Sequence, residues 1–317
     1  MPDGTKPFNL AAALSRLKPK DKAPRSAHIL DVWVAQAEVQ LESDGGRLGW
    51  LVASTVVAAA LQSAVDADGS SRFLLKGGTM LQHRLPGATR TTTDVDGLVR
   101  GDIDGYLATL DAALRQPWGP VTFKRGIVEV IDVPGKLIKP RRFDMVLLLN
   151  GVTWRRLQVE VSPDEGQAGQ TADRIAAPSL AGFGLPTPDY LVTPSLQYQI
   201  AQKVHAATDL HAPPEFVNDR ARDVVDLLLL RDLIQSAGEP QLSAVRAAIV
   251  DIFDARAAES AVTAREPRRW PARLTAYPHW QVSYKKAAES AGVSASLDDG
   301  VSAVNAWLAQ IDAACGA

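Results

Sequence analysis

The pattern of apolar and polar residues divides the chain into two parts that differ in the spacing of their apolar residues. Before about residue 163, helical spacing alternates with short apolar or β-branched runs, which is typical of an α/β arrangement. From Tyr190 onward the spacing is almost entirely helical. The predicted helices are residues 9–17, 28–41, 48–65 and 102–115 in the first part, and 195–208, 217–236, 241–261, 277–291 and 301–314 in the second.

The predicted strands lie in the first part of the chain. They cover residues 73–76, 91–99, 121–133, 141–149 and 154–161. Asn150-Gly151 separates the last two, and this dipeptide is the strongest short signal for a hairpin turn. A Pro- and Gly-rich loop follows residue 163. We therefore predict an α/β domain over residues 1–180, with a mixed, twisted sheet flanked by helices, and an α-helical domain over residues 181–317. A cleft between two such lobes is a common place for a substrate.

Composition narrows the class of protein. The 317 residues are 46% hydrophobic and 22% charged, and the formal net charge is −2, so any contact with nucleic acid must come from local basic clusters. Such clusters occur at residues 136–142, 155–156 and 265–273, and the last contains Trp270 as a possible stacking surface. The single cysteine, Cys315, excludes an internal disulfide and a zinc site built from several cysteines.

The sequence also predicts where the protein works. A lone cysteine fits a reducing compartment, and the N-terminus has no apolar run long enough for a secretory signal. The most apolar stretch, residues 48–65, is short, rich in Ala and interrupted by polar residues, which favours a buried helix over a membrane span. We therefore expect a cytoplasmic protein with no membrane partner.

The most informative stretch begins with KGGTM. A predicted strand ends at Lys76 and delivers Gly77 and Gly78 into a tight turn, and a helix starts at Thr79. Glycines allow a ligand to approach the backbone closely, and the first turn of a helix offers free N–H groups to phosphate oxygens. We therefore predict that Lys76, Gly77, Gly78 and Thr79 bind a nucleotide.

A pair of carboxylates follows about fifteen residues later. Asp94 and Asp96 lie on one predicted strand, and alternation places both side chains on the same face. Two hard oxygen ligands side by side suit Mg²⁺, which prefers carboxylates together with substrate phosphates. Thr92 points to the same side by strand parity, and Arg90 lies two residues upstream of it; both are further candidates for phosphate contact.

Two-metal phosphoryl chemistry needs a third carboxylate on a neighbouring strand. The predicted hairpin offers Asp144 and Glu160, each of which interrupts an otherwise apolar strand. An unpaired charge there would be costly without a function. The turn at Asn150-Gly151 prevents both carboxylates from lying directly beside the Asp94–Asp96 pair.

The helical part supplies further charged candidates. Gln199 and Lys203 lie one turn apart on the same helix face, and Lys203 is predicted to reach into the cleft as a point charge for a triphosphate. Asp223 and Asp226 share a face of the next helix, with Arg220 and Arg222 nearby. An ion-pair network on a helix surface is the ordinary explanation for such groups.

Three ordered blocks resemble one known family. FLLKGGTML…ATRTTTDVDGL, the hairpin that ends in VEV, and SLQYQIAQKVHAATDLH…NDRARDVVDLLLL are similar to the blocks of the AbiEii/AbiGii nucleotidyltransferase toxin family. That family includes the MenT toxins and belongs to the DNA polymerase beta-like superfamily. The resemblance covers roughly residues 50–235. It favours Glu160 as the third carboxylate, although family members usually carry Asp there.

The resemblance implies a nucleotidyltransferase fold and a specific activity. It implies a Mg²⁺- or Mn²⁺-dependent transfer of a nucleotide from an NTP to an acceptor hydroxyl, with the 3′ end of a tRNA as the acceptor and a neighbouring antitoxin as the restraining partner. The expected metal ligands are Asp94, Asp96 and Glu160, and Lys203 and Asp223 complete the catalytic set. The resemblance implies that Asp223 holds either Lys203 or a metal-bound water in place.

Two other functions remain open at this point. The same site would also serve an enzyme that modifies protein hydroxyls by nucleotidylation or phosphorylation. A regulator that binds a nucleotide without turning it over is the alternative outside enzymes.

Overall fold

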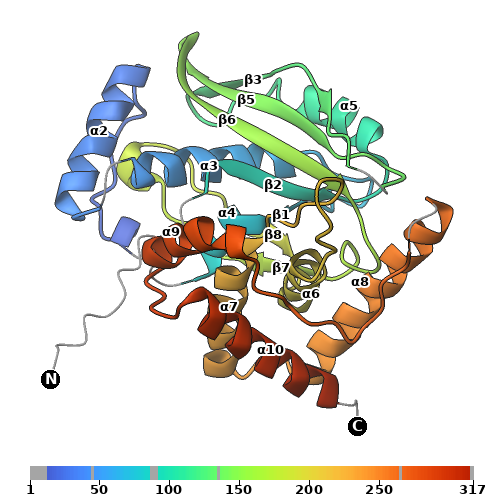
Figure 1. Cartoon of the computed structure of the whole chain (residues 1–317). Coiled ribbons are helices and arrows are strands. Elements are labelled where there is room, and N and C mark those ends of the chain that lie inside the picture. Colours follow the sequence, from blue (N-terminus) through green and yellow to red (C-terminus); the bar gives the residue numbers. More distant parts are fainter. Residues whose placement is uncertain (1–12, 44–45, 86–91, 134–135, 264–265, 315–317) are drawn as a thin grey trace, which may run out of the picture.

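The computed structural model describes residues 13–43, 46–85, 92–133, 136–263 and 266–314. Its centre is a mixed sheet, and Figure 1 shows this sheet above a group of helices from the second half of the chain. The strand order is β1 (Phe73–Lys76), β2 (Asp94–Val99), β6 (Val152–Pro163), β5 (Arg141–Leu149) and β3 (Val121–Arg125), with β4 (Glu129–Val130) also paired to β5.

Strands β2 and β6 form the parallel pair at the centre of this sheet, and the other pairings between its strands are antiparallel. The predicted mixed sheet is therefore confirmed. Asn150 and Gly151 both have positive φ, 49° and 77°, as a two-residue hairpin turn requires, and they join β5 directly to β6. The predicted strand over residues 121–133 is two strands, β3 and β4, interrupted at Gly126.

Helices cover the sheet and supply much of its core. Helix α3 (Arg47–Gln62) is buried along nearly its whole length and contacts β1, β5 and β6, which confirms the prediction of a buried helix at this position. Helix α2 (Ala27–Gln40) begins at the N-cap Ser26 and packs on α3. Helix α5 (Ile103–Ala113) begins at the N-cap Asp102 and contacts β6. Within the described ranges, every helix is too short or too polar to span a bilayer.

The second half is helical, as predicted. Helix α6 (Leu196–Ala207) packs against α7 (Ala221–Ala237) and α8 (Leu242–Val262), and α7 also contacts α9 (Gln281–Ala291) and α10 (Leu297–Ala313). One continuous cluster of buried apolar side chains includes residues from both halves. The helical half is therefore packed onto the α/β half through a shared core.

The loop predicted after residue 163 contains structure that the sequence pattern did not indicate. Strands β7 (Ala172–Ile175) and β8 (Leu191–Pro194) pair antiparallel, and β8 contacts β1 and α3. Each strand has only four residues, which is too short for the alternation to stand out. Strand β8 lies in the part of the chain that was assigned to the helical domain, but it packs on the α/β half. The domain division at residue 180 stays a prediction. Most of the helix predicted over residues 9–17 lies outside the described residues.

Candidate active site

A row of charged side chains crosses the sheet. Strand pairing places Lys76 opposite Asp96, Asp96 opposite Glu160, and Glu160 opposite Arg142, on β1, β2, β6 and β5 in turn. Residues directly opposite each other on neighbouring strands share a face, so these four side chains form one line. Two carboxylates lie at its centre and one cation lies at each end.

The two aspartates of β2 share one cavity. Asp94 lies two residues before Asp96 on the same face, as strand parity predicted, and both line a cavity of about 420 Å³. Gln158 of β6 is the partner of Asp94 in the register, and its side-chain amide donates to Asp94 at 3.1 Å and to Glu160 at 3.5 Å. A single amide thus links the carboxylates of two strands.

The two candidates for the third carboxylate occupy different places. Glu160 is directly beside Asp96 and lines the cavity. Its Oε1 accepts two hydrogen bonds from the guanidinium of Arg142, at 2.9 and 2.6 Å. Asp144 lies one strand further out, and it forms an ion pair with Arg156 at 3.2 Å. Of the two, Glu160 is therefore the carboxylate close to the Asp94–Asp96 pair.

The negative charge of the carboxylates at the centre of the row is only partly compensated by nearby cations. Burial raises the pKa of Asp96 above its ordinary value, and the neighbouring carboxylates Glu160 and Asp94 raise it further, while Lys76 and Lys203 act in the opposite direction. Within the described ranges, no three Asp, Glu, His or Cys side chains are grouped closely enough to hold a metal ion by themselves. Mg²⁺ typically uses one or two carboxylates and completes its shell with water and substrate phosphates. The Asp94–Asp96 pair fits that donor set.

Gly77 is required by the carboxylate itself. Its φ is +68°, and a Cβ at this position would overlap the carboxylate of Asp96. Helix α4 (Gly77–Arg84) starts at this turn, with Gly78 buried in its first turn. The sequence predicted that a ligand would approach the glycines closely, and in the structure Asp96 makes this approach.

Side chains near this turn bond within the protein. Thr79 is fully buried, and its hydroxyl donates to the backbone oxygen of Asp94 at 2.7 Å, which ties α4 to β2. Lys76 donates from its ammonium to the hydroxyl of Ser162 at 2.6 Å, and burial lowers its pKa. These two side chains, predicted to contact a nucleotide, support the carboxylates and are not among the residues that line the cavity.

The opposite wall of the cavity comes from the helical half. It contains Asp219, Arg220, Arg222 and Asp223, and Ser283 of α9 completes it. Arg220 and Arg222 are exposed. In the described part of the chain, neither guanidinium has a hydrogen bond or ion pair. Two unpaired cations thus face the carboxylates of the sheet across the cavity.

Lys203 differs from its prediction. It is buried, and its ammonium donates to Asp223 at 2.8 Å and to Asp226 at 2.6 Å, whereas the sequence predicted that it would reach into the cleft. The expected contact between Lys203 and Asp223 is present. Thr92 is buried and lines the cavity, while Arg90 lies outside the described residues.

The sequence over most of this chain matches a known family. The sequence model of the nucleotidyl transferase AbiEii toxin family, of type IV toxin–antitoxin systems, matches residues 59–309. This chain belongs to the AbiEii family. It is therefore a nucleotidyltransferase of the toxin class, and the matched residues include both walls of the cavity.

This AbiEii chain was also compared with curated protein sequences and with solved structures. No curated protein matches the sequence. Among solved structures, MenT4, a nucleotidyltransferase toxin from Mycobacterium tuberculosis, is similar at 17% identity with a TM-score of 0.44. The alignment covers 90% of this chain and 99% of that one. The family assignment rests on the sequence model alone.

The basic clusters of the AbiEii chain are largely committed to ion pairs. Lys136 bonds Glu165 at 2.7 Å, and Arg155 bonds Asp31 at 2.7 Å. The indole N–H of Trp270, the predicted stacking surface, donates to Asp312 at 2.7 Å. Sequence reasoning gave these clusters more weight than Arg220 and Arg222, because it interpreted the latter as partners of Asp223. The proximity of these two arginines to the carboxylates depends on how α7 docks, which no local pattern indicates.

Proposed function

We propose that this chain transfers a nucleoside monophosphate from an NTP to an acceptor hydroxyl, and that the acceptor is the 3′ end of a tRNA. The observation that carries the proposal is the two-sided cavity. Asp94 and Asp96 line one wall, and Arg220 and Arg222 line the other. Such a site suits a triphosphate whose charge is neutralised by the arginines on one side and by divalent cations held by the carboxylates on the other.

Asp94 and Asp96 are the residues that would hold Mg²⁺ or Mn²⁺, and Glu160 lies beside Asp96 on β6. A bound divalent ion would stabilise charge on the phosphates and orient them. The raised pKa of Asp96 supports this assignment, because a cation would relieve the repulsion that burial and two neighbouring carboxylates create. The hydrogen bond from the side-chain amide of Gln158 would orient Asp94 for this role.

The protein contributes mainly position and charge. Arg220 and Arg222, which line the cavity, bind the phosphates. The acceptor hydroxyl attacks the α-phosphorus in line, the bond to the bridging oxygen breaks, and pyrophosphate leaves.

Lys203 acts in this proposal through Asp223. Its ammonium is bonded to a carboxylate that lines the cavity, so it fixes that wall without touching the phosphates. Lys76 lies opposite Asp96 in the strand register and attracts its carboxylate electrostatically. Thr92 and Arg90 are further candidates for phosphate contact.

The family supports the biological setting. A type IV toxin of this class implies a cognate antitoxin, and addition of nucleotides to tRNA 3′ ends would prevent aminoacylation and stop growth. The acceptor and the partner both belong to the cytoplasm, where we propose that the protein acts.

The direct test incubates purified protein with Mg²⁺, each of the four labelled NTPs in turn, and purified tRNA. Wild-type protein is expected to label the tRNA. Asp94→Ala is expected to lower the rate by about a thousandfold, because a metal ligand contributes several kcal/mol to transition-state stabilisation. Asp298→Ala, an exposed aspartate at the start of α10, is the matched control and should retain the wild-type rate.

Three other results would contradict the proposal. Label on a protein in place of tRNA would assign the chain to protein modification. NTP binding without product would indicate a silent regulator. Transfer to tRNA that survives Asp94→Ala would remove the proposed mechanism.

A further inference from the structure

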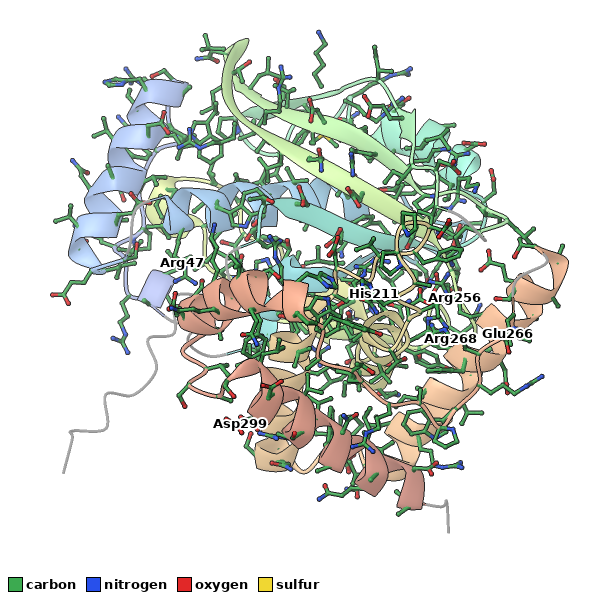
Figure 2. The ribbon with its side chains drawn as sticks, viewed as in Figure 1. Arg47, His211, Arg256, Glu266, Arg268 and Asp299 are labelled. Atoms are coloured by element: carbon green, nitrogen blue, oxygen red, sulfur yellow. The ribbon has the colours of Figure 1, made fainter. Side chains whose placement is uncertain are left out.

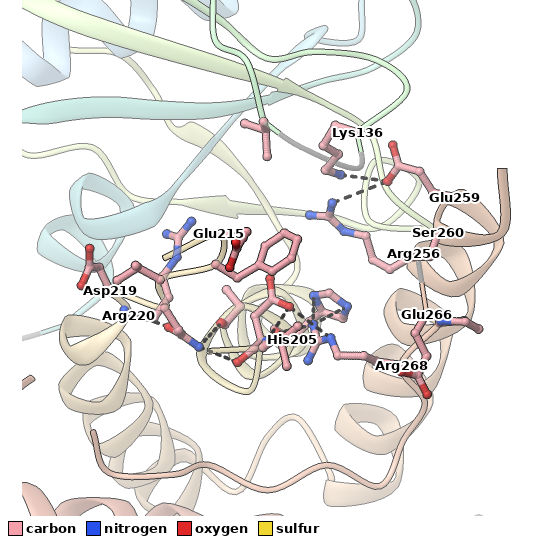
Figure 3. Close-up of a pocket in the computed structure, with 18 residues that line it drawn as sticks. Lys136, His205, Glu215, Asp219, Arg220, Arg256, Glu259, Ser260, Glu266 and Arg268 are labelled. Carbon is pink, nitrogen blue, oxygen red and sulfur yellow. Dashed lines mark hydrogen bonds and ion pairs between the residues drawn. The ribbon is translucent and has the colours of Figure 1, made fainter. Parts of the chain in front are cut away.

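A second and larger cavity adjoins the first. Its volume is about 720 Å³, and it shares Asp219 and Arg220 with the cavity that contains the carboxylates. Its other walls come from the loop between α6 and α7, from α8, and from the segment around Arg268. Figure 3 shows Glu215, Asp219 and Arg220 on one side, and Arg256, Ser260 and Glu266 on the other.

Apart from Arg220 at the junction, the Lys and Arg side chains that line this second cavity form ion pairs within the protein. Lys136 bonds Glu165 at 2.7 Å and Glu259 at 3.3 Å. Arg256 bonds Glu165 at 2.7 Å, and Arg268 bonds Asp209 at 3.2 Å. Figure 2 shows Arg256, Arg268 and Glu266 gathered on the same side of the molecule.

Two carboxylates of the cavity lack such partners. Glu215 and Glu266 are exposed and have no ion pair with any described residue. Free carboxylates repel phosphates but accept hydrogen bonds from amines, ring N–H groups and hydroxyls. The cavity therefore suits an uncharged polar group.

Apolar surface completes the cavity. Phe216, Leu210 and Val217 line it. His205 also lines it, and burial lowers the pKa of this imidazole to about 3, with Arg268 and Lys136 acting in the same direction. The imidazole is therefore neutral at physiological pH. A volume of about 720 Å³ lies within the usual range for small-molecule sites and exceeds what a nucleoside needs.

We propose that this second cavity binds the base and ribose of a nucleotide whose phosphates lie at Arg220. The inference rests on the proposed nucleotidyl transfer. Arg220 stands at the junction, so a ligand with its phosphates among the carboxylates of the first cavity extends its uncharged part into the second. Glu215 and Glu266 accept hydrogen bonds from the base or the ribose, and Phe216 provides an apolar surface. The nucleoside belongs either to the entering NTP or to the 3′-terminal nucleotide of the acceptor.

The test separates nucleoside binding from phosphate binding. Isothermal titration of the full chain with Mg²⁺ would use inorganic triphosphate and the non-hydrolysable α,β-methylene analogue of each NTP. Ser260→Trp fills the cavity from α8, and Ser260→Ala is its matched control. We expect Ser260→Trp to weaken binding of the NTP analogues by about tenfold or more, while triphosphate binds as in wild type. Ser260→Ala should bind both like wild type.

A second variant tests the same proposal at an exposed position, in case Ser260→Trp does not fold. Glu215→Gln lies at an exposed position and should not disturb the fold. It is expected to weaken binding of the analogues by about fivefold, as the loss of one hydrogen bond to a charged acceptor implies.

The remaining outcomes show whether the bound nucleoside belongs to the NTP or to the tRNA, or they overturn the inference. Unchanged binding of the analogues with an acceptor KM raised about tenfold would assign the cavity to the end of the tRNA. Unchanged values for both substrates, or an equal loss for triphosphate and analogue, would overturn the inference while leaving the proposed function intact. Wild-type protein that binds neither triphosphate nor analogue would remove the proposed function and this inference with it.

Discussion

The two walls of the first cavity use the same residue types in opposite ways. On the sheet, Asp94, Asp96 and Glu160 stand together, and burial and mutual repulsion raise the pKa of Asp96. On the helical side, Lys203 lies buried between Asp223 and Asp226, with hydrogen bonds of 2.8 and 2.6 Å.

The difference shows which wall is prepared for a ligand. The helical triad already holds its ammonium between two carboxylates, so adding an external ion there would displace existing bonds. On the sheet, burial and the neighbouring carboxylates outweigh the opposing effect of Lys76 and Lys203, so the pKa of Asp96 stays raised. A catalytic carboxylate is therefore better recognised by a missing partner than by its residue type.

The largest expected effect comes from breaking the helical triad. Lys203→Met would leave Asp223 and Asp226 without their shared ammonium, and removing one partner of a buried ion pair typically costs about 3–5 kcal/mol. Urea unfolding followed by circular dichroism would measure the loss. Lys285→Met, at an exposed lysine of α9, is the control and should leave the free energy of unfolding within about 0.5 kcal/mol of wild type. A loss below about 1 kcal/mol in Lys203→Met would show that the triad is not a structural unit.

A smaller effect of opposite sign is expected on the sheet. The folded pKa of Asp96 is raised above the ordinary value of 3.8, so the folded protein holds this proton more tightly than the unfolded chain does. Stability is therefore lost as pH rises from 3.8 through the raised pKa. Asp96→Asn removes this loss. At pH 8 the variant should melt about 2 °C or more above wild type, although it is inactive.

Differential scanning calorimetry at several pH values would check this prediction. The advantage of Asp96→Asn should shrink as pH falls toward 3.8. A variant that melts below wild type at pH 8, or a difference independent of pH, would contradict the electrostatic account of the sheet wall.

The smallest expected effect concerns Arg142. Its pair with Glu160 is partly exposed, with side-chain exposures of 41% and 30%, so Arg142→Met should change the free energy of unfolding by less than about 1 kcal/mol. Release of Glu160 should nevertheless lower the Mg²⁺ concentration needed for half-maximal transfer by about threefold, as added negative charge favours the cation. Arg156→Met, which breaks the similar pair with Asp144, is the control. An equal Mg²⁺ shift in both variants would exclude a specific role for Glu160.

Local patterns in the sequence predicted much of this arrangement. Asn150-Gly151 indicated the hairpin because few residue pairs adopt two successive positive φ angles, and strand parity placed Asp94 and Asp96 on one face. Both features depend on neighbouring residues only.

Features that depend on distant segments were not predictable in the same way. The choice between Asp144 and Glu160 needed the parallel pairing of β2 with β6, whose register is set by packing more than sixty residues away in the chain. The burial of Lys203 needed the docking of α6 on α7. Residue types and spacing were consistent with either position of its ammonium.

The glycine at position 77 is constrained by the neighbouring aspartate as well as by the turn. A methyl group there would overlap Asp96, so the glycine is tied to the presence of the aspartate as well as to any phosphate. In related chains the two positions should covary: where the aspartate is replaced by a smaller residue, selection against a side chain at the glycine position weakens. In a related sequence, a larger residue at the position of Gly77 would then indicate that the carboxylate at the position of Asp96 has been lost.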